Sequence, residues 1–153
     1  MKPPLGDTLV ICDMDNTLLT AKEGIPACNR AVIRLYTGMG GLFTVATGRP
    51  PESIRAALGN LKLSLPAISC NGALLYDFST ESVLHRSTLN REQATTAIID
   101  ILAKFPRMGV EVMAGNGEMY VIHANEVTHA HQVDEHLGSI ACPVESVPDG
   151  WIK

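Results

Sequence analysis

The first half of the chain alternates short apolar runs with segments of helical character. Three runs, Leu9 to Cys12, GLFTVAT at 41–47 and LPAIS at 65–69, end at polar residues or glycine and predict strands, the first of them buried. Between them, residues 26–36 and PPESIRAALGN at 50–60 predict two helices, because proline suits a helix start and glycine follows each end. The order strand, helix, strand, helix, strand predicts a parallel sheet with right-handed crossovers.

The pattern changes after Asn71, where the apolar runs come in pairs. GALLYD at 72–77 and SVLHR at 82–86 flank a polar turn, so they predict two paired strands. VEVMAGNGEMYVI at 110–122 alternates around Gly115-Asn116-Gly117, which predicts a hairpin.

Two helices and a further strand are expected in the second half. Asn90, followed by Gln93 three residues later, resembles a capping box at the start of a helix. Apolar residues continue from there at helical spacing until Pro106, which ends the helix. A second helix is expected from about Glu126 to His136, and a short strand near Val144.

The composition is that of an ordinary globular domain, with 153 residues, 46% hydrophobic and 18% charged, and a formal net charge of −4. An acidic balance argues against a nucleic-acid or membrane-surface protein, whose affinity would come from a basic patch. No apolar stretch approaches the length of a membrane span, and the start, MKPPLGDTL, lacks the apolar core of a signal peptide. The scattered cysteines, without a C-x-x-C pair, favour reduced thiols and a cytoplasmic protein over disulfides or a metal site.

Two aspartates, Asp13 and Asp15, come directly after the first predicted strand. Residues two apart in a strand project to the same side, and ligands bind at the carboxyl edge of a parallel sheet, so both carboxylates are expected to face one cavity. Neighbouring carboxylates repel each other and need a cation or a shared proton; such a pair can act as nucleophile and general acid–base with magnesium. For this motif alone, a pair of turn or helix-cap aspartates remains an alternative.

The sequence around these aspartates resembles two motifs of the haloacid dehalogenase-like phosphohydrolases. DMDNTLLT at 13–20 is similar to the first motif, and FTVATGRP at 43–50 is similar to the second. Together with AISCNGALLYD at 67–77, they resemble the Cof-type branch, whose members carry a large α/β cap inserted after the third core strand. The resemblance implies an α/β fold: a partial Rossmann-like parallel sheet in residues 1–78, the N-terminal part of the core, and part of the cap in 79–153.

The resemblance also implies a role for each matched residue. Asp13 would attack phosphorus and form an aspartyl-phosphate, and Asp15 would protonate the leaving alcohol and then activate water. Mg²⁺ would be bound by the Asp13 carboxylate and the backbone carbonyl of Asp15. Thr47 would donate its hydroxyl to a phosphoryl oxygen, and Thr17 would order the loop after the strand.

Further matched residues would surround the substrate. Gly48 allows close approach of the backbone, and Arg49 would meet an anionic substrate or residues of the cap. Asn71 and Gly72 match the family's Asn-Gly at the crossing from core to cap, although an ordinary turn explains this dipeptide equally well. Asn16 stands where many members have glycine, and asparagine tolerates the positive φ that the turn requires.

The matched motifs are only half of those that the family uses. Its members also carry a lysine and a later acidic pair after the cap, and neither is evident before the chain stops at VPDGWIK, 147–153. With two Mg²⁺ ligands and no lysine clamp, the chain is expected to be a poor or inactive catalyst, because comparable losses cost about a hundred- to a thousandfold in rate. The expectation is therefore an incomplete fragment of a phosphatase that acts on a small phosphorylated metabolite.

The same incompleteness predicts self-association. The strand before Asp13 would be an edge with open backbone donors and acceptors, so the chain is expected to form a homodimer by edge pairing or exchange of segments. The alternative to an enzyme is a non-catalytic module that binds phosphate or self-associates. Magnesium-dependent phosphatase activity in this chain would count against that alternative.

Overall fold

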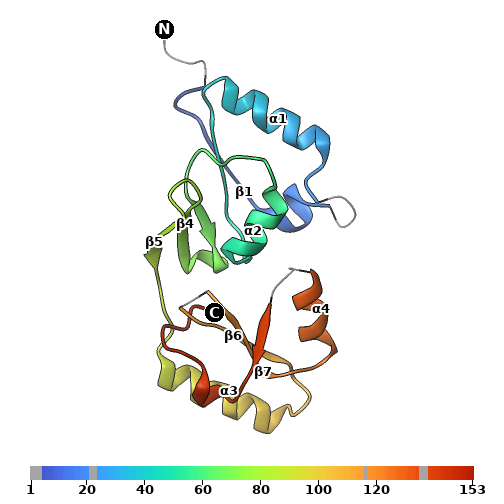
Figure 1. Cartoon of the computed structure of the whole chain (residues 1–153), viewed down its shortest axis with the longest axis vertical. Coiled ribbons are helices and arrows are strands. Elements are labelled where there is room, and N and C mark those ends of the chain that lie inside the picture. Colours follow the sequence, from blue (N-terminus) through green and yellow to red (C-terminus); the bar gives the residue numbers. More distant parts are fainter. Residues whose placement is uncertain (1–4, 21–23, 116, 135–137) are drawn as a thin grey trace. The chain divides into compact units, whose positions relative to one another are not determined.

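The computed structural model describes residues 5–20, 24–115, 117–134 and 138–153. The chain divides into two compact units, Met1–His85 and Arg86–Lys153, and each unit has its own strands and helices (Figure 1).

The first unit is built on parallel strands connected by helices. β1 (Leu9–Cys12) pairs in parallel with β2 (Leu42–Val45) along its whole length, and α1 (Ala27–Gly38) connects them (Figure 1). α2 (Pro51–Leu58) leads to β3 (Ala67–Ser69), which lies parallel beside the end of β2 through a bridge between Ala46 and Ile68. The predicted order of strands and helices is confirmed.

β3 also begins an antiparallel sheet. It pairs with β4 (Leu74–Asp77), and β5 (Ser82–Arg86) follows β4 in the same sheet, which confirms the two predicted paired strands. Cys70 and Asn71 connect β3 to β4 with positive φ angles of 52° and 56°. Asparagine tolerates this backbone region better than most residues, so the turn suits the sequence there.

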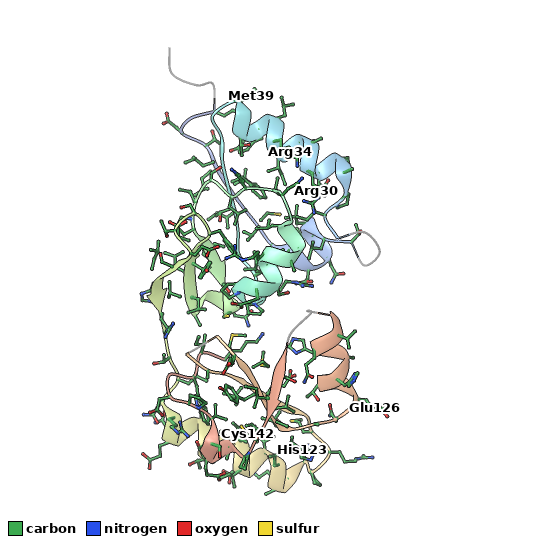
Figure 2. The ribbon with its side chains drawn as sticks, in the orientation of Figure 1. Arg30, Arg34, Met39, His123, Glu126 and Cys142 are labelled. Atoms are coloured by element: carbon green, nitrogen blue, oxygen red, sulfur yellow. The ribbon has the colours of Figure 1, made fainter. Side chains whose placement is uncertain are left out.

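Helices α1 and α2 are joined by the side chain of Arg30 as well as by apolar packing. Arg30 and Arg34 both lie on α1 (Figure 2), and the Arg30 guanidinium donates to the carbonyl oxygens of Ala57 and Leu58 at 3.1 and 2.6 Å. These oxygens at the end of α2 lack partners within the helix, so a cation there satisfies them and complements the helix dipole. A core of buried apolar side chains in this unit comprises Met14, Leu18, Ile25, Ile33, Phe43, Val45, Ile54, Leu58, Leu61 and Ala67.

β1 is a strand, as predicted, but the prediction that it is buried is wrong. Leu9, Val10 and Ile11 are 45%, 41% and 50% exposed. Within the described part of the chain β1 pairs with β2 alone, so its other edge carries no strand there. An apolar run shows that a strand can be buried, whereas the actual burial of the strand depends on how many other elements pack beside it.

The described residues of the second unit form a mixed sheet and two α-helices. β6 (Val110–Met113) and β7 (Met119–His123) form the predicted antiparallel hairpin, and β8 (Ser139–Ala141) pairs in parallel with β7. α3 (Arg91–Lys104) precedes the hairpin and α4 (Glu126–Asp134) follows it. Of the turn that was predicted at Gly115-Asn116-Gly117, the asparagine lies outside the described residues.

The predictions for this unit have mixed outcomes. Asn90 caps α3, since its side-chain oxygen accepts a hydrogen bond from the backbone N–H of Gln93 at 3.0 Å, as predicted. The strand predicted near Val144 is wrong, because Val144–Ser146 form a single helical turn and the strand is β8, a few residues earlier. The predicted end of the second helix at His136 lies outside the described residues.

Trp151 is at the centre of the second unit's core. Its side chain is buried, and its indole N–H donates to the carbonyl oxygen of Pro148 at 2.9 Å. The apolar residues packed with it are Val112, Ala114, Tyr120, Val144 and Val147. None of the helices in the described ranges is both long enough and apolar enough to cross a membrane.

Candidate functional site

The carboxyl ends of β1 and β2 meet at one edge of the parallel sheet. Cys12 pairs with Val45 in the ladder, and the backbone N–H of Ala46 donates to the Cys12 carbonyl at 3.0 Å. Asp13 therefore follows β1 at the same level at which the chain leaves β2 toward Thr47. The Thr47 N–H donates to the carbonyl oxygen of Ile68 at 3.0 Å, and this hydrogen bond attaches the edge to β3 as well.

Asp13 and the loop after it form a tight turn. The Thr17 hydroxyl donates to Oδ2 of Asp13 at 3.0 Å, and the turn is closed by a 2.8 Å bond from the Leu19 N–H to the Met14 carbonyl. Met14 and Leu18 are buried in the core, whereas Asp13 and Thr17 are exposed. The loop thus holds its polar side chains outward because its apolar ones are anchored.

Asn16 in this loop has a φ of 59°. This is the positive φ that was expected where the family has glycine, and asparagine adopts it at low cost.

Thr47, Gly48 and Asn71 are brought together by the turns after β2 and β3. Thr47 is buried, and the Asn71 N–H donates to its carbonyl oxygen at 3.1 Å. A Cβ at Gly48 would lie 2.8 Å from Oδ1 of Asn71, so a larger residue there would force the asparagine side chain to move. These predicted substrate-binding residues are therefore mutual neighbours, although they lie far apart in sequence.

Arg49 contacts Asp15, a pairing that the sequence did not indicate. Its Nε lies 2.9 and 3.2 Å from the two carboxylate oxygens of Asp15, and its Nη2 lies 2.8 Å from Oδ1. The Arg49 side chain is 14% exposed and that of Asp15 is 49% exposed. The only available signal was that a basic and an acidic residue follow two neighbouring parallel strands, which does not by itself specify a contact.

The arginine changes the protonation of Asp15. Its hydrogen bonds lower the pKa of the Asp15 carboxyl below the ordinary value, an effect that partial burial opposes and that the positive charge of Arg49 reinforces. The pair therefore holds Asp15 as a carboxylate, the form that accepts a proton.

Two serines that sequence reasoning missed also contact Arg49. Ser53 Oγ lies 2.7 Å from Nη1 of the guanidinium, and the Ser69 hydroxyl donates to the Arg49 backbone carbonyl at 2.7 Å. Both serines are buried. No motif marks either residue: Ser53 follows Arg49 by four residues, at the start of α2, whereas Ser69 is twenty residues away along the chain.

The oxygen donors at this edge fit one side of a magnesium site. Among the residues that the structure describes, no three His, Cys, Asp or Glu side chains gather as a metal-binding group. Mg²⁺ commonly uses one or two carboxylates together with waters and substrate phosphate oxygens. Asp13 is exposed and can supply a carboxylate, and the backbone carbonyl of Asp15 can supply a second oxygen, while the Asp15 carboxylate is engaged by Arg49.

Comparison with known proteins gives a consistent family. A family model described as haloacid dehalogenase-like hydrolase matches residues 10–143. Among curated proteins, the chain is 36% identical over 93 residues to a Bacillus subtilis 5-amino-6-(5-phospho-D-ribitylamino)uracil phosphatase, covering 61% of this chain and 31% of that protein. It is also 36% identical over 77 residues to an Escherichia coli pyridoxal phosphate phosphatase, covering 50% of this chain and 28% of that protein.

Solved structures show the same fold over most of the chain. A haloacid dehalogenase-like hydrolase from Bacteroides thetaiotaomicron matches with a TM-score of 0.74 and 14% identity, covering 94% of this chain and 55% of that one. A subclass IIB sugar phosphatase of the same superfamily matches with a TM-score of 0.74 and 22% identity, covering 90% and 53%. The chain thus spans about half the length of these structures, and the aligned segments cover about a third of the curated relatives.

Proposed function

Because the chain belongs to the haloacid dehalogenase-like hydrolase family, we propose that it is part of a Cof-type phosphatase that hydrolyses a small phosphomonoester in the cytoplasm. The observation that carries the proposal is the position of Asp13, directly after β1 and at the same sheet edge as Thr47. A nucleophile and a phosphate-binding hydroxyl at one edge of a parallel sheet are the minimum for phosphoryl transfer.

Asp13 is the proposed nucleophile. One of its carboxylate oxygens attacks phosphorus, the bond from phosphorus to the alcohol oxygen breaks, and the alcohol leaves with a proton from Asp15. Water that has lost a proton to Asp15 then attacks the aspartyl-phosphate, which releases phosphate and restores Asp13. Two displacements replace one difficult hydrolysis. The Thr17 hydrogen bond supports this role, because it orients the Asp13 carboxylate.

Asp15 is the proposed general acid–base, and the state described here suits only half of that task. Paired with Arg49, it is held as the carboxylate that accepts a proton from water. Donating a proton to the leaving alcohol requires the protonated acid. The hydrogen bonds from Arg49 to Asp15 must therefore weaken before the first displacement. This requirement agrees with the expectation that the chain by itself is a poor catalyst.

The proposed substrate-binding residues are Thr47, Gly48, Arg49 and Asn71. The first two and Asn71 are mutual neighbours, and Arg49 also contacts Asp15. Phosphatases of this superfamily generally use Mg²⁺. We propose that the Asp13 carboxylate and the Asp15 carbonyl hold the ion, which would neutralise charge on the phosphoryl oxygens.

The proposed organisation assigns residues 1–78 to the N-terminal part of the family's core and 79–153 to part of its α/β cap. The lengths of the solved relatives support the view that this sequence is a portion of the whole phosphatase, since it covers 53% to 55% of them. The observed compact units divide after His85, within β5.

Phosphate release tests the proposal. The chain is incubated with a small phosphomonoester and Mg²⁺, alongside Asp13→Asn and a control, Asp7→Asn, which removes a carboxylate outside the site. The native chain and Asp7→Asn are expected to release phosphate slowly, at a rate about a hundred- to a thousandfold below that of a phosphatase with all of its charge-stabilising groups. Asp13→Asn is expected to release none. Equal turnover by Asp13→Asn and the native chain would remove the proposal.

A non-catalytic module is the second candidate, favoured by the exposed edge of β1. The open backbone and exposed apolar residues of β1 suit pairing with a second copy of the chain, and we propose a homodimer through this edge. Binding of inorganic phosphate without any release of phosphate from an ester, in the same assay, would select this alternative.

A further inference from the structure

The backbone of Arg49 is attached to both neighbouring strands of the parallel sheet. Its N–H donates to Oγ1 of Thr47, which follows β2, at 3.2 Å. Its carbonyl oxygen accepts from the Ser69 hydroxyl at 2.7 Å and from the backbone N–H of Cys70 at 3.2 Å, at the end of β3. The arginine side chain therefore starts from a backbone whose position is well defined.

The guanidinium of Arg49 uses its three nitrogens on two different elements. Nε and Nη2 donate to Asp15 in the loop after β1, and Nη1 donates to Ser53 in the first turn of α2. Because the guanidinium is planar with donors in fixed directions, acceptors on two elements define its orientation. Ser53 is 2% exposed, so the serine is the rigid support and the half-exposed aspartate is the group supported.

We propose that Ser53 is a positioning residue whose hydroxyl orients the Arg49 guanidinium and, through it, the carboxylate of Asp15. A buried hydroxyl needs a hydrogen-bond partner, and Ser53 has the arginine as one. An apolar residue at this position would remove the acceptor that fixes Nη1, and the guanidinium could then rotate about its contact with Asp15. The catalytic consequence of this contact rests on the proposed function, in which Asp15 is the general acid–base. The hydrogen bond between Ser53 and Arg49 is independent of that function.

The test is the rate at which the Nε–H of Arg49 exchanges with water, measured by NMR on the native chain and its variants. Ser53→Ala is expected to accelerate this exchange by about tenfold, because a hydrogen bond to a charged group is worth at least that factor. Ser53→Thr keeps the hydroxyl and is expected to restore the native rate. The backbone amide spectrum of α2 is expected to stay unchanged, which separates a positioning role from a general loosening of the helix.

Ser69→Ala is the matched control. Ser69 is also buried and also bonds to Arg49, but at the backbone carbonyl, so its loss is expected to leave the Nε–H exchange unchanged. Equal acceleration in both variants, or none in Ser53→Ala, would overturn the positioning role. If Ser53→Ala does not fold, Ser53→Cys tests the same contact, since it keeps the volume but is a weak acceptor. None of these measurements needs phosphatase activity, so their failure is distinguishable from failure of the Asp13→Asn assay.

Discussion

β1 and β2 are neighbouring parallel strands of similar apolar character that differ in burial. Their sequences, LVIC and LFTV, pair residue by residue from Leu9 with Leu42 to Cys12 with Val45. Phe43, Thr44 and Val45 of β2 are buried, whereas Leu9, Val10 and Ile11 of β1 are exposed. β2 has β1 on one side and meets β3 on the other, while β1 has β2 alone among the described residues. The number of neighbours, not apolar character, therefore determines burial.

The same difference extends to the polar groups that follow the two strands. Thr47, after β2, is buried and bonded to the backbone on both sides. Asp13 and Asp15, after β1, are exposed; Thr17 contacts the carboxylate of Asp13 and Arg49 contacts that of Asp15. The phosphate-binding half of the site is thus held by the backbone, and the acidic half is held by side-chain hydrogen bonds.

Matched valine truncations measure the difference between the strands most directly. Val45→Ala is expected to lower the free energy of unfolding by about 2 kcal/mol, since each buried methyl group deleted costs about 1 kcal/mol. Val10→Ala, in the exposed strand, is expected to cost less than about 0.5 kcal/mol. Chemical denaturation of both variants at low protein concentration gives the two values, and equal losses would show that β1 is covered in solution.

A charge on the open edge is the next test. Val10→Lys is expected to convert a homodimer into a monomer, because an edge lysine disfavours pairing with another strand. Val32→Lys, on the exposed face of α1, adds the same charge away from the edge and is expected to leave the dimer intact. Sedimentation at high micromolar concentration distinguishes the two masses, and a native chain that is strictly monomeric would contradict edge pairing.

The smallest expected effect concerns the pKa of Asp15. Arg49 lowers this pKa in the folded protein, so the pair contributes stability above the ordinary aspartate pKa and loses it as the pH falls through the lowered value. Arg49→Met is expected to raise the pKa of Asp15 toward the ordinary value, measured from the carboxyl carbon shift against pH.

Asp77 serves as the internal control in that titration. Hydrogen bonds from Ser79 lower the pKa of its carboxyl, and Arg49 is not among their sources. The titration of Asp77 is therefore expected to stay unchanged in Arg49→Met. An Asp15 that titrates as in the native chain would show that another group holds its pKa down.

The elements of the fold were largely predictable because they depend on local patterns. Proline and glycine mark the ends of α1 and α2, and Asn90 caps α3 as its spacing with Gln93 indicated. β8 was missed because its three residues are too few to show a period.

The sequence by itself determined the order of strands and helices, and with it the placement of Asp13 and Thr47 at one sheet edge. Strand order and direction follow from short connections and local periodicity, and both can be read from residues that are close together in the sequence. Only the tertiary structure decided that β1 is exposed and that Arg49 binds Asp15. These outcomes depend on which distant segments pack together, and no local pattern of residues contains that information.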